Sequence, residues 1–179
     1  MEHRIAKVNI CSAGGTAGKG SKTCKITLPT TWVEMLGITK EHREMALTFD
    51  GTKITLSQHL SGPDFAERQL AQSHEVRILR FYDRDDLCST IYADFTAQTV
   101  VVENQEVPTI KTAFGNNLLP NWEDFQRFLQ ERCIPRQRAG LREYLETLGL
   151  EEYDPLAIIE KTGGRMAEDQ QWLTIEVLK

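Results

Sequence analysis

The chain has 179 residues, 40 % of them hydrophobic, and a net charge of −5, so it can bury one ordinary core or two small ones. No run of 18 apolar residues occurs, which excludes an apolar membrane-spanning helix, and no apolar segment follows Met1, so we expect no secretory signal. Four scattered cysteines without a Cys-x-x-Cys pair favour reduced thiols in a cytoplasmic protein over disulfides or a zinc site.

Residues 1–59 contain four short segments in which apolar and polar residues alternate with period two, as is typical of half-buried strands. They are residues 6–11, 22–28, 44–49 and 52–56. A glycine-rich loop, residues 12–21, separates the first two, and an Asp-Gly pair, a strong hairpin signal, joins the last two. The sequence therefore predicts two hairpins. Cys11 and Cys24 could face each other across the first, although a pair of small residues is the simpler interpretation.

A short helix is predicted between the two hairpins. Pro29 ends the second strand and suits a helix start, and Thr31 with Glu34 has the spacing of a capping box. Gly37 is typical of the position just beyond a helix C-terminus. The helix should therefore be no longer than two turns.

A break at Ser61-Gly62-Pro63 is the best domain boundary, and a polar helix over residues 64–73 is expected to act as a linker. Strands are then predicted at residues 76–82, 87–93, 99–103 and 172–177, the first three as a meander. Helices are predicted after the N-cap Asn121, over residues 138–148, and between Asp154 and Gly163. The apolar stripe Trp122, Phe125, Phe128 and Leu129 is interpreted as core.

These elements predict an α+β fold in three parts. Residues 1–59 form one module, residues 60–75 a linker helix, and residues 76–179 a small antiparallel sheet packed with about three helices. The charge divides at the same place, because residues 1–59 carry eight Lys/Arg against five Asp/Glu, giving +3, and residues 60–179 carry −8. Opposite charges indicate different partners, and only the first module has the sign that attracts DNA phosphates.

One segment carries a family resemblance. Lys25-Ile-Thr-Leu-Pro-Thr-Thr-Trp-Val-Glu-Met-Leu-Gly-Ile38 gives a strand, a proline step, a short helix and a Leu-Gly-Ile exit, and Lys53-Ile-Thr-Leu56 follows the Asp-Gly turn. This order resembles the DNA-binding domains of the AbrB/MazE/SpoVT type over about residues 4–58. The resemblance implies a swapped-hairpin β-barrel built by two chains, and hence a homodimer, or a higher oligomer, that binds double-stranded DNA.

Physical reasoning agrees with a dimer, because about 55 residues of short strands bury little apolar surface alone. The loop at residues 12–21 is longer than is common in that family, which leaves the docking geometry open. Its glycines allow close approach to phosphate, and lysines beside it add charge without base specificity. The predicted DNA contacts are Arg4, Lys7, Lys19, Lys22 and Lys25. The alternative is a solvated loop whose lysines only maintain solubility.

No catalytic residue, cofactor or metal is predicted. The glycines around Lys19 miss the P-loop spacing by one residue, and no Ser or Thr follows the lysine. Asp83, Asp85 and Asp86 could hold a divalent cation, but an acidic turn between strands is the simpler explanation. An enzyme remains the third hypothesis, because catalytic groups need only be neighbours in space.

The C-terminal part contains a local basic cluster. A second anion contact is predicted at Arg132, Arg136, Arg138 and Arg142, since arginine forks suit phosphate or carboxylate. The alternative, salt bridges to neighbouring glutamates, is favoured. Lys161, Arg165 and Asp169 around a Gly-Gly turn form a further polar candidate.

Segments such as Tyr153-Asp-Pro and Lys161-Thr-Gly-Gly-Arg are similar to domains that accompany AbrB-like modules in Gram-positive bacteria and mobile elements. That resemblance implies association with such a module and no particular activity. The leading hypothesis is thus a dimeric transcriptional regulator whose C-terminal domain senses or binds a protein. The alternative is an antitoxin, or a phage or mobile-element inhibitor of a host nuclease defence, acting through its acidic C-terminal domain.

Overall fold

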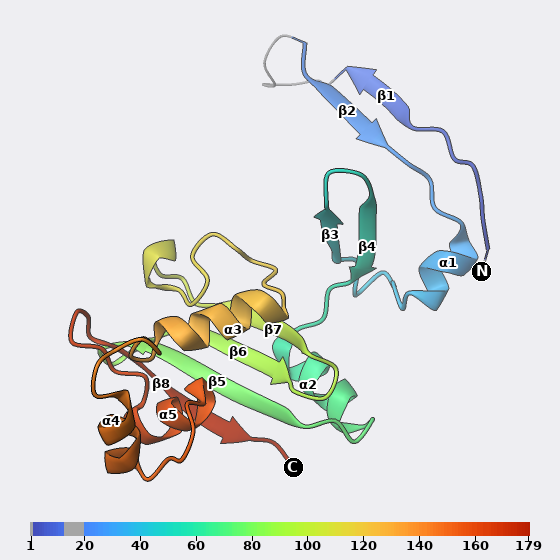
Figure 1. Cartoon of the computed structure of the whole chain (residues 1–179). Helices are drawn as coiled ribbons and strands as arrows, with labels where there is room; N and C mark the ends of the chain where they lie inside the picture. The colour runs from blue at the N-terminus through green and yellow to red at the C-terminus, as the bar shows by residue number, and fades with distance from the viewer. Residues whose placement is uncertain (1, 13–19) are drawn as a thin grey trace. The chain divides into compact units, whose positions relative to one another are not determined.

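The computed structural model describes residues 2–12 and 20–179, and the chain divides into two compact units (Figure 1). Unit 1 is Met1–His59 and unit 2 is Leu60–Lys179. The described residues form small antiparallel sheets and five α-helices, which confirms the predicted α+β class.

Unit 1 consists of two separate β-hairpins and a short helix. Its elements are β1 (Asn9–Ser12), β2 (Lys22–Lys25), α1 (Thr30–Met35), β3 (Met45–Phe49) and β4 (Ile54–Gln58). β1 pairs only with β2, and β3 only with β4, among the described residues. A single chain therefore does not close a barrel by itself, and the expected swapped barrel would need strands from another chain.

Helix α1 ends as the sequence predicts but begins differently. Gly37 adopts φ +69°, donates its N–H to Glu34 O at 2.9 Å, and is followed by an Ile38 N–H bond to Val33 O at 3.1 Å. This pair of bonds is a Schellman motif, for which glycine suits the left-handed position. The predicted Thr31–Glu34 capping box is wrong, because the N-cap is Pro29, two residues before Thr31, and no side chain caps the helix.

The register of the first hairpin separates the two exposed cysteines. Cys11 is paired with Thr23, whereas Cys24 is paired with Ile10. Directly paired residues of an antiparallel ladder share a face, so Cys11 and Cys24 lie on opposite faces of the ribbon. The suggestion that they face each other is therefore wrong.

Unit 2 is built on a four-stranded antiparallel sheet with the order β7-β6-β5-β8. Its strands are β5 (Val76–Asp83), β6 (Asp86–Asp94), β7 (Thr99–Asn104) and β8 (Gln171–Val177). The predicted meander, β5 to β7, is confirmed. β8 comes from the far end of the unit and pairs with the free edge of β5 (Figure 1).

Helices α3 (Trp122–Glu131), α4 (Leu141–Leu148) and α5 (Pro155–Thr162) supply the core on one face of this sheet. Phe125, Phe128 and Leu129 are fully or almost fully buried there, which confirms that the aromatic stripe of α3 is core. Asn121 accepts from the Asp124 N–H, and the Asp124 carboxylate accepts from the Asn121 N–H, so the predicted cap is a complete capping box.

Helix α2 (Gly62–Leu70) covers the opposite face of the sheet and is not a linker. Phe65 and Ala66 are buried in a cluster with residues of β5 and β6. Gly62 donates its N–H to Glu103 Oε1 at 2.7 Å, and a Cβ on this glycine would lie 1.9 Å from the Tyr92 ring. Residues 60–75 therefore belong to unit 2, because the backbone of α2 packs closely against the sheet at Gly62.

Candidate nucleic-acid interface

The first hairpin has one apolar face. Ile10 and Cys24 are direct partners on that face. On the alternation of a strand, Val8, just before β1, and Ile26, just after β2, fall on the same side. Each of the three aliphatic side chains is more than half exposed to solvent.

The opposite face of this hairpin is polar and basic. Asn9 pairs with Lys25, and alternation places Lys7 and Thr23 on the same side as that pair. Lys22 pairs with Ser12 and so falls on the apolar side, at the end near the loop. The predicted lysines of β2 therefore do not share one face.

The second hairpin repeats this division. Leu47 pairs with Leu56 and Phe49 with Ile54, so all four side chains lie on one face. Leu47, Phe49 and Ile54 are 61 %, 70 % and 64 % exposed. The other face carries small and hydroxyl side chains, including Thr48 opposite Thr55. Both hairpins of the described chain thus present an apolar face that is largely exposed to solvent.

Unit 1 has no buried residue within residues 2–12 and 20–59. Unit 2, by contrast, contains two clusters of buried residues, one on each face of its sheet. Exposed apolar surface of this extent costs free energy in water and marks an interaction site. The uncovered faces of the hairpins are therefore the surfaces on which a partner would pack.

The predicted DNA contacts are distributed over the described part of unit 1. Arg4 and Lys7 are exposed in the segment before β1, and Lys22 and Lys25 are exposed on β2. Lys19 lies outside the described residues. None of the four described side chains has a carboxylate partner within this part of the chain, so their charge is available to an external anion.

The turn of the second hairpin is fixed by Asp50. Its carboxylate accepts bonds from the Thr52 hydroxyl at 2.7 Å, the Thr52 N–H at 2.9 Å and the Lys53 N–H at 3.0 Å. These bonds, the hydroxyl bond first, lower the pKa of Asp50. Gly51 has φ +94°, so the predicted Asp-Gly turn is confirmed as the connection between β3 and β4.

The predicted second anion contact does not form one surface. Arg138 precedes α4, which begins at Leu141 and not at residue 138, so it shares no helix face with Arg142. Arg142 pairs with Glu146 at 3.1 Å, as the salt-bridge interpretation predicts. The Arg136 guanidinium lies 4.8 Å from the centre of the Tyr153 ring and donates a hydrogen bond to the backbone carbonyl of Tyr153.

Arg132, the fourth member of that cluster, is a buried structural residue. It donates to Gly164 O at 2.7 and 3.0 Å and to Gln171 O at 2.8 Å. It also donates to both carboxylate oxygens of Asp169, at 2.6 and 3.1 Å. Hydrogen bonding from Arg132 is the main cause of the lowered pKa of Asp169. Arg132 is therefore unavailable to an external anion, because its donors are already engaged inside the unit.

The acidic turn and the cysteines offer no further site. Lys111 neutralises Asp83 at 2.6 Å, and no group of three metal-ligating side chains occurs among residues 2–12 and 20–179. Cys88 and Cys133 are buried, and burial raises the pKa of both thiols, that of Cys133 to about 12.

Comparison with protein-family models, with curated proteins and with solved structures gave no match to this chain. Within the described residues, no helix combines the length and apolar character needed to cross a bilayer.

Proposed function

We propose that the protein is a dimeric DNA-binding protein in which unit 1 completes a swapped-hairpin barrel with the same unit of a second copy. The main supporting observation is that both hairpins are amphipathic, while none of the described residues of unit 1 is buried. Two copies of equally incomplete hairpins can cover each other's apolar faces around a two-fold axis. The resemblance of residues 25–38 and 50–56 to AbrB/MazE-type domains supports the same arrangement.

In such a dimer the polar face of the first hairpin points away from the shared core. Lys7 and Lys25 lie on that face, and Arg4 precedes them in the chain. The two-fold axis presents each lysine twice, which suits a duplex with repeated phosphate contacts. Transcriptional regulation is the function we infer from duplex binding, with unit 2 as the sensing or protein-binding part.

The test is a titration of duplex DNA with the full-length protein at several salt concentrations. The Lys7→Gln/Lys25→Gln variant removes four positive charges from the dimer, so affinity should fall at least about tenfold and the salt slope should flatten by about four. The matched control is Lys161→Gln/Lys179→Gln, which makes the same charge change in unit 2 and should leave both quantities unchanged.

Equal loss of affinity in the two double variants would reject the lysine assignment. If the wild-type protein fails to bind any duplex, the DNA-binding proposal is rejected. Recovery of one stoichiometric protein partner from the native host would then favour the inhibitor or antitoxin alternative.

Thiol labelling gives a second test, because it measures the accessibility of each face of the first hairpin separately. In the dimer Cys24 lies on the covered face and Cys11 on the polar face, so Cys11 should react with a maleimide at least about tenfold faster. Cys88 and Cys133 should not react until the protein is unfolded, because both are buried and their thiols resist ionisation. Peptide mass spectrometry after timed labelling measures all four rates. Equal rates at Cys11 and Cys24 in the native protein would contradict the arrangement of the faces.

A further inference from the structure

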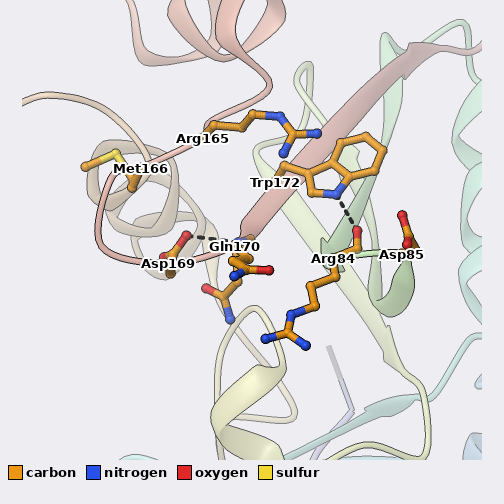
Figure 2. Close-up of a pocket in the computed structure, with 8 residues that line it drawn as sticks. Arg84, Asp85, Arg165, Met166, Asp169, Gln170 and Trp172 are labelled. Atoms are coloured by element: carbon orange, nitrogen blue, oxygen red, sulfur yellow. Dashed lines mark hydrogen bonds between the residues drawn. The ribbon is translucent and has the colours of Figure 1, made fainter.

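A pocket of about 400 Å³ opens in unit 2 where the β5–β6 turn meets the segment between α5 and β8 (Figure 2). The side chains that define its chemistry are Arg84, Arg165, Asp169, Gln170 and Trp172. The proposed DNA contacts of unit 1 do not include any of them.

Two guanidinium groups of this pocket have no acidic partner among the described residues. Five other arginines of unit 2 form ion pairs with carboxylates: Arg77, Arg80, Arg127, Arg132 and Arg142. Arg84 and Arg165 form none with the part of the chain that the structure describes. The Arg165 guanidinium carbon lies 4.8 Å from the centre of the Trp172 ring, a cation–π contact that uses none of the guanidinium's hydrogen-bonding capacity for a carboxylate.

The acidic side chains of the pocket do not cancel these charges. Asp169 is already bound on both oxygens by the buried Arg132, so its charge is neutralised from inside the unit. Asp85 is the other carboxylate of the lining. Within the described part of the chain, the lining thus has two guanidinium groups without an acidic partner and one carboxylate without a basic partner, so the local field favours an anion.

The walls of the pocket are held in place before any ligand arrives. The Arg84 N–H donates to Gln170 O at 3.0 Å, and the Arg84 carbonyl accepts from Trp172 Nε1 at 2.6 Å. These bonds hold Arg84 at φ +56°, a left-handed conformation that non-glycine residues adopt rarely. Trp172 also stacks on Tyr82 with ring centres 4.5 Å apart. A preformed site loses less entropy on binding than a flexible one.

We propose that this pocket binds an extended phosphate ligand, one whose negative charges are spread along its length. Figure 2 shows the side chains of Arg84 and Arg165 at opposite ends of the pocket, with Gln170 between them. A chain of phosphates can contact both guanidinium groups and place its middle beside the amide of Gln170. Phosphate suits guanidinium forks, and the volume is in the range of small-molecule sites. A nucleoside polyphosphate and a single nucleic-acid strand both have this chemistry.

The experiment uses the full chain carrying Lys7→Gln/Lys25→Gln, which weakens binding by unit 1. The pocket variant and its control share this background, so the difference between them is independent of the proposed function. Two probes are titrated: adenosine triphosphate by calorimetry, and a labelled twelve-nucleotide thymidine strand by fluorescence anisotropy. The pocket variant adds Arg84→Gln/Arg165→Gln. The matched control adds Arg138→Gln/Arg142→Gln, which removes two exposed arginines outside the pocket.

We expect at least one probe to bind, and the pocket variant to weaken that binding at least about tenfold while the control stays within twofold. Loss of triphosphate binding identifies a small ligand as the source of the phosphate, and loss of strand binding identifies a nucleic acid. The proposal is overturned if neither probe binds at millimolar concentration, or if the pocket variant and the control bind equally. Thermal unfolding of both variants verifies that unit 2 is folded.

Discussion

Phe49→Asp should convert the proposed dimer into a monomer. Phe49 lies beside Leu47 on the exposed apolar face of β3–β4. Because the interface is two-fold, one substitution removes the Phe49 side chain from both copies. Burial of such side chains contributes about 1.5–3 kcal/mol each, and a buried carboxylate adds a further cost. The dissociation constant should therefore rise at least about a thousandfold. Sedimentation or light scattering over a dilution series measures the change.

The matched control for this prediction is Thr48→Asp. Thr48 is on the same strand but on the opposite, polar face of the hairpin, so the variant should dimerise like the wild type. Duplex binding should follow the oligomeric state, lost in Phe49→Asp and retained in Thr48→Asp. A wild-type protein that is monomeric at micromolar concentration, with unit 1 folded, would contradict the dimer and the barrel together.

Arg132→Leu should destabilise unit 2 by about 3–5 kcal/mol, because it leaves the Asp169 carboxylate and the carbonyls of Gly164 and Gln171 without their donor. Urea unfolding followed by tryptophan fluorescence measures the loss. Arg142→Leu removes an exposed pair with Glu146 and should cost less than about 1 kcal/mol. Equal effects of the two substitutions would show that the Arg132 network contributes little.

The pH dependence of stability gives this prediction a second measurement. The folded-state pKa of Asp169 is lowered, so its contribution to stability is fully present above the unfolded-state pKa, about 3.9. That contribution is lost as the pH falls through the folded-state value. The free energy of unfolding of the wild type should therefore decrease between pH 5 and pH 2 more steeply than that of Arg132→Leu.

Local signals explain why most elements could be predicted from the sequence. The capping residues Asn121 and Asp154 define helix starts in the structure, and the Asp-Gly turn connects β3 to β4. Each signal acts within a few residues, so tertiary contacts did not override it. The predicted Thr31–Glu34 capping box does not form, because Pro29, two residues before Thr31, takes the cap position.

Long-range packing explains what the sequence could not show. In the sequence Arg132 belongs to the same local cluster of arginines as the exposed Arg136 and Arg138, and only its contacts with residues 32 to 39 positions away make it structural. The sequence of helix α2 is polar enough to resemble a linker. The helix nevertheless packs on the sheet, because Gly62 has no Cβ that would collide with the Tyr92 ring. The sequence around Arg84 is typical of an acidic turn between strands, and the positive φ that distinguishes this arginine is visible only in the backbone.

The late pairing of β8 has a consequence for how unit 2 is assembled. Arg77 of β5 is matched with Val177 of β8, so one edge of the sheet has no neighbour until nearly the entire unit has been synthesised. Contacts between such distant positions slow folding, and an open edge can recruit strands from other molecules. A nascent chain that has β5 but not yet β8 should therefore be the species most prone to aggregate and to engage chaperones.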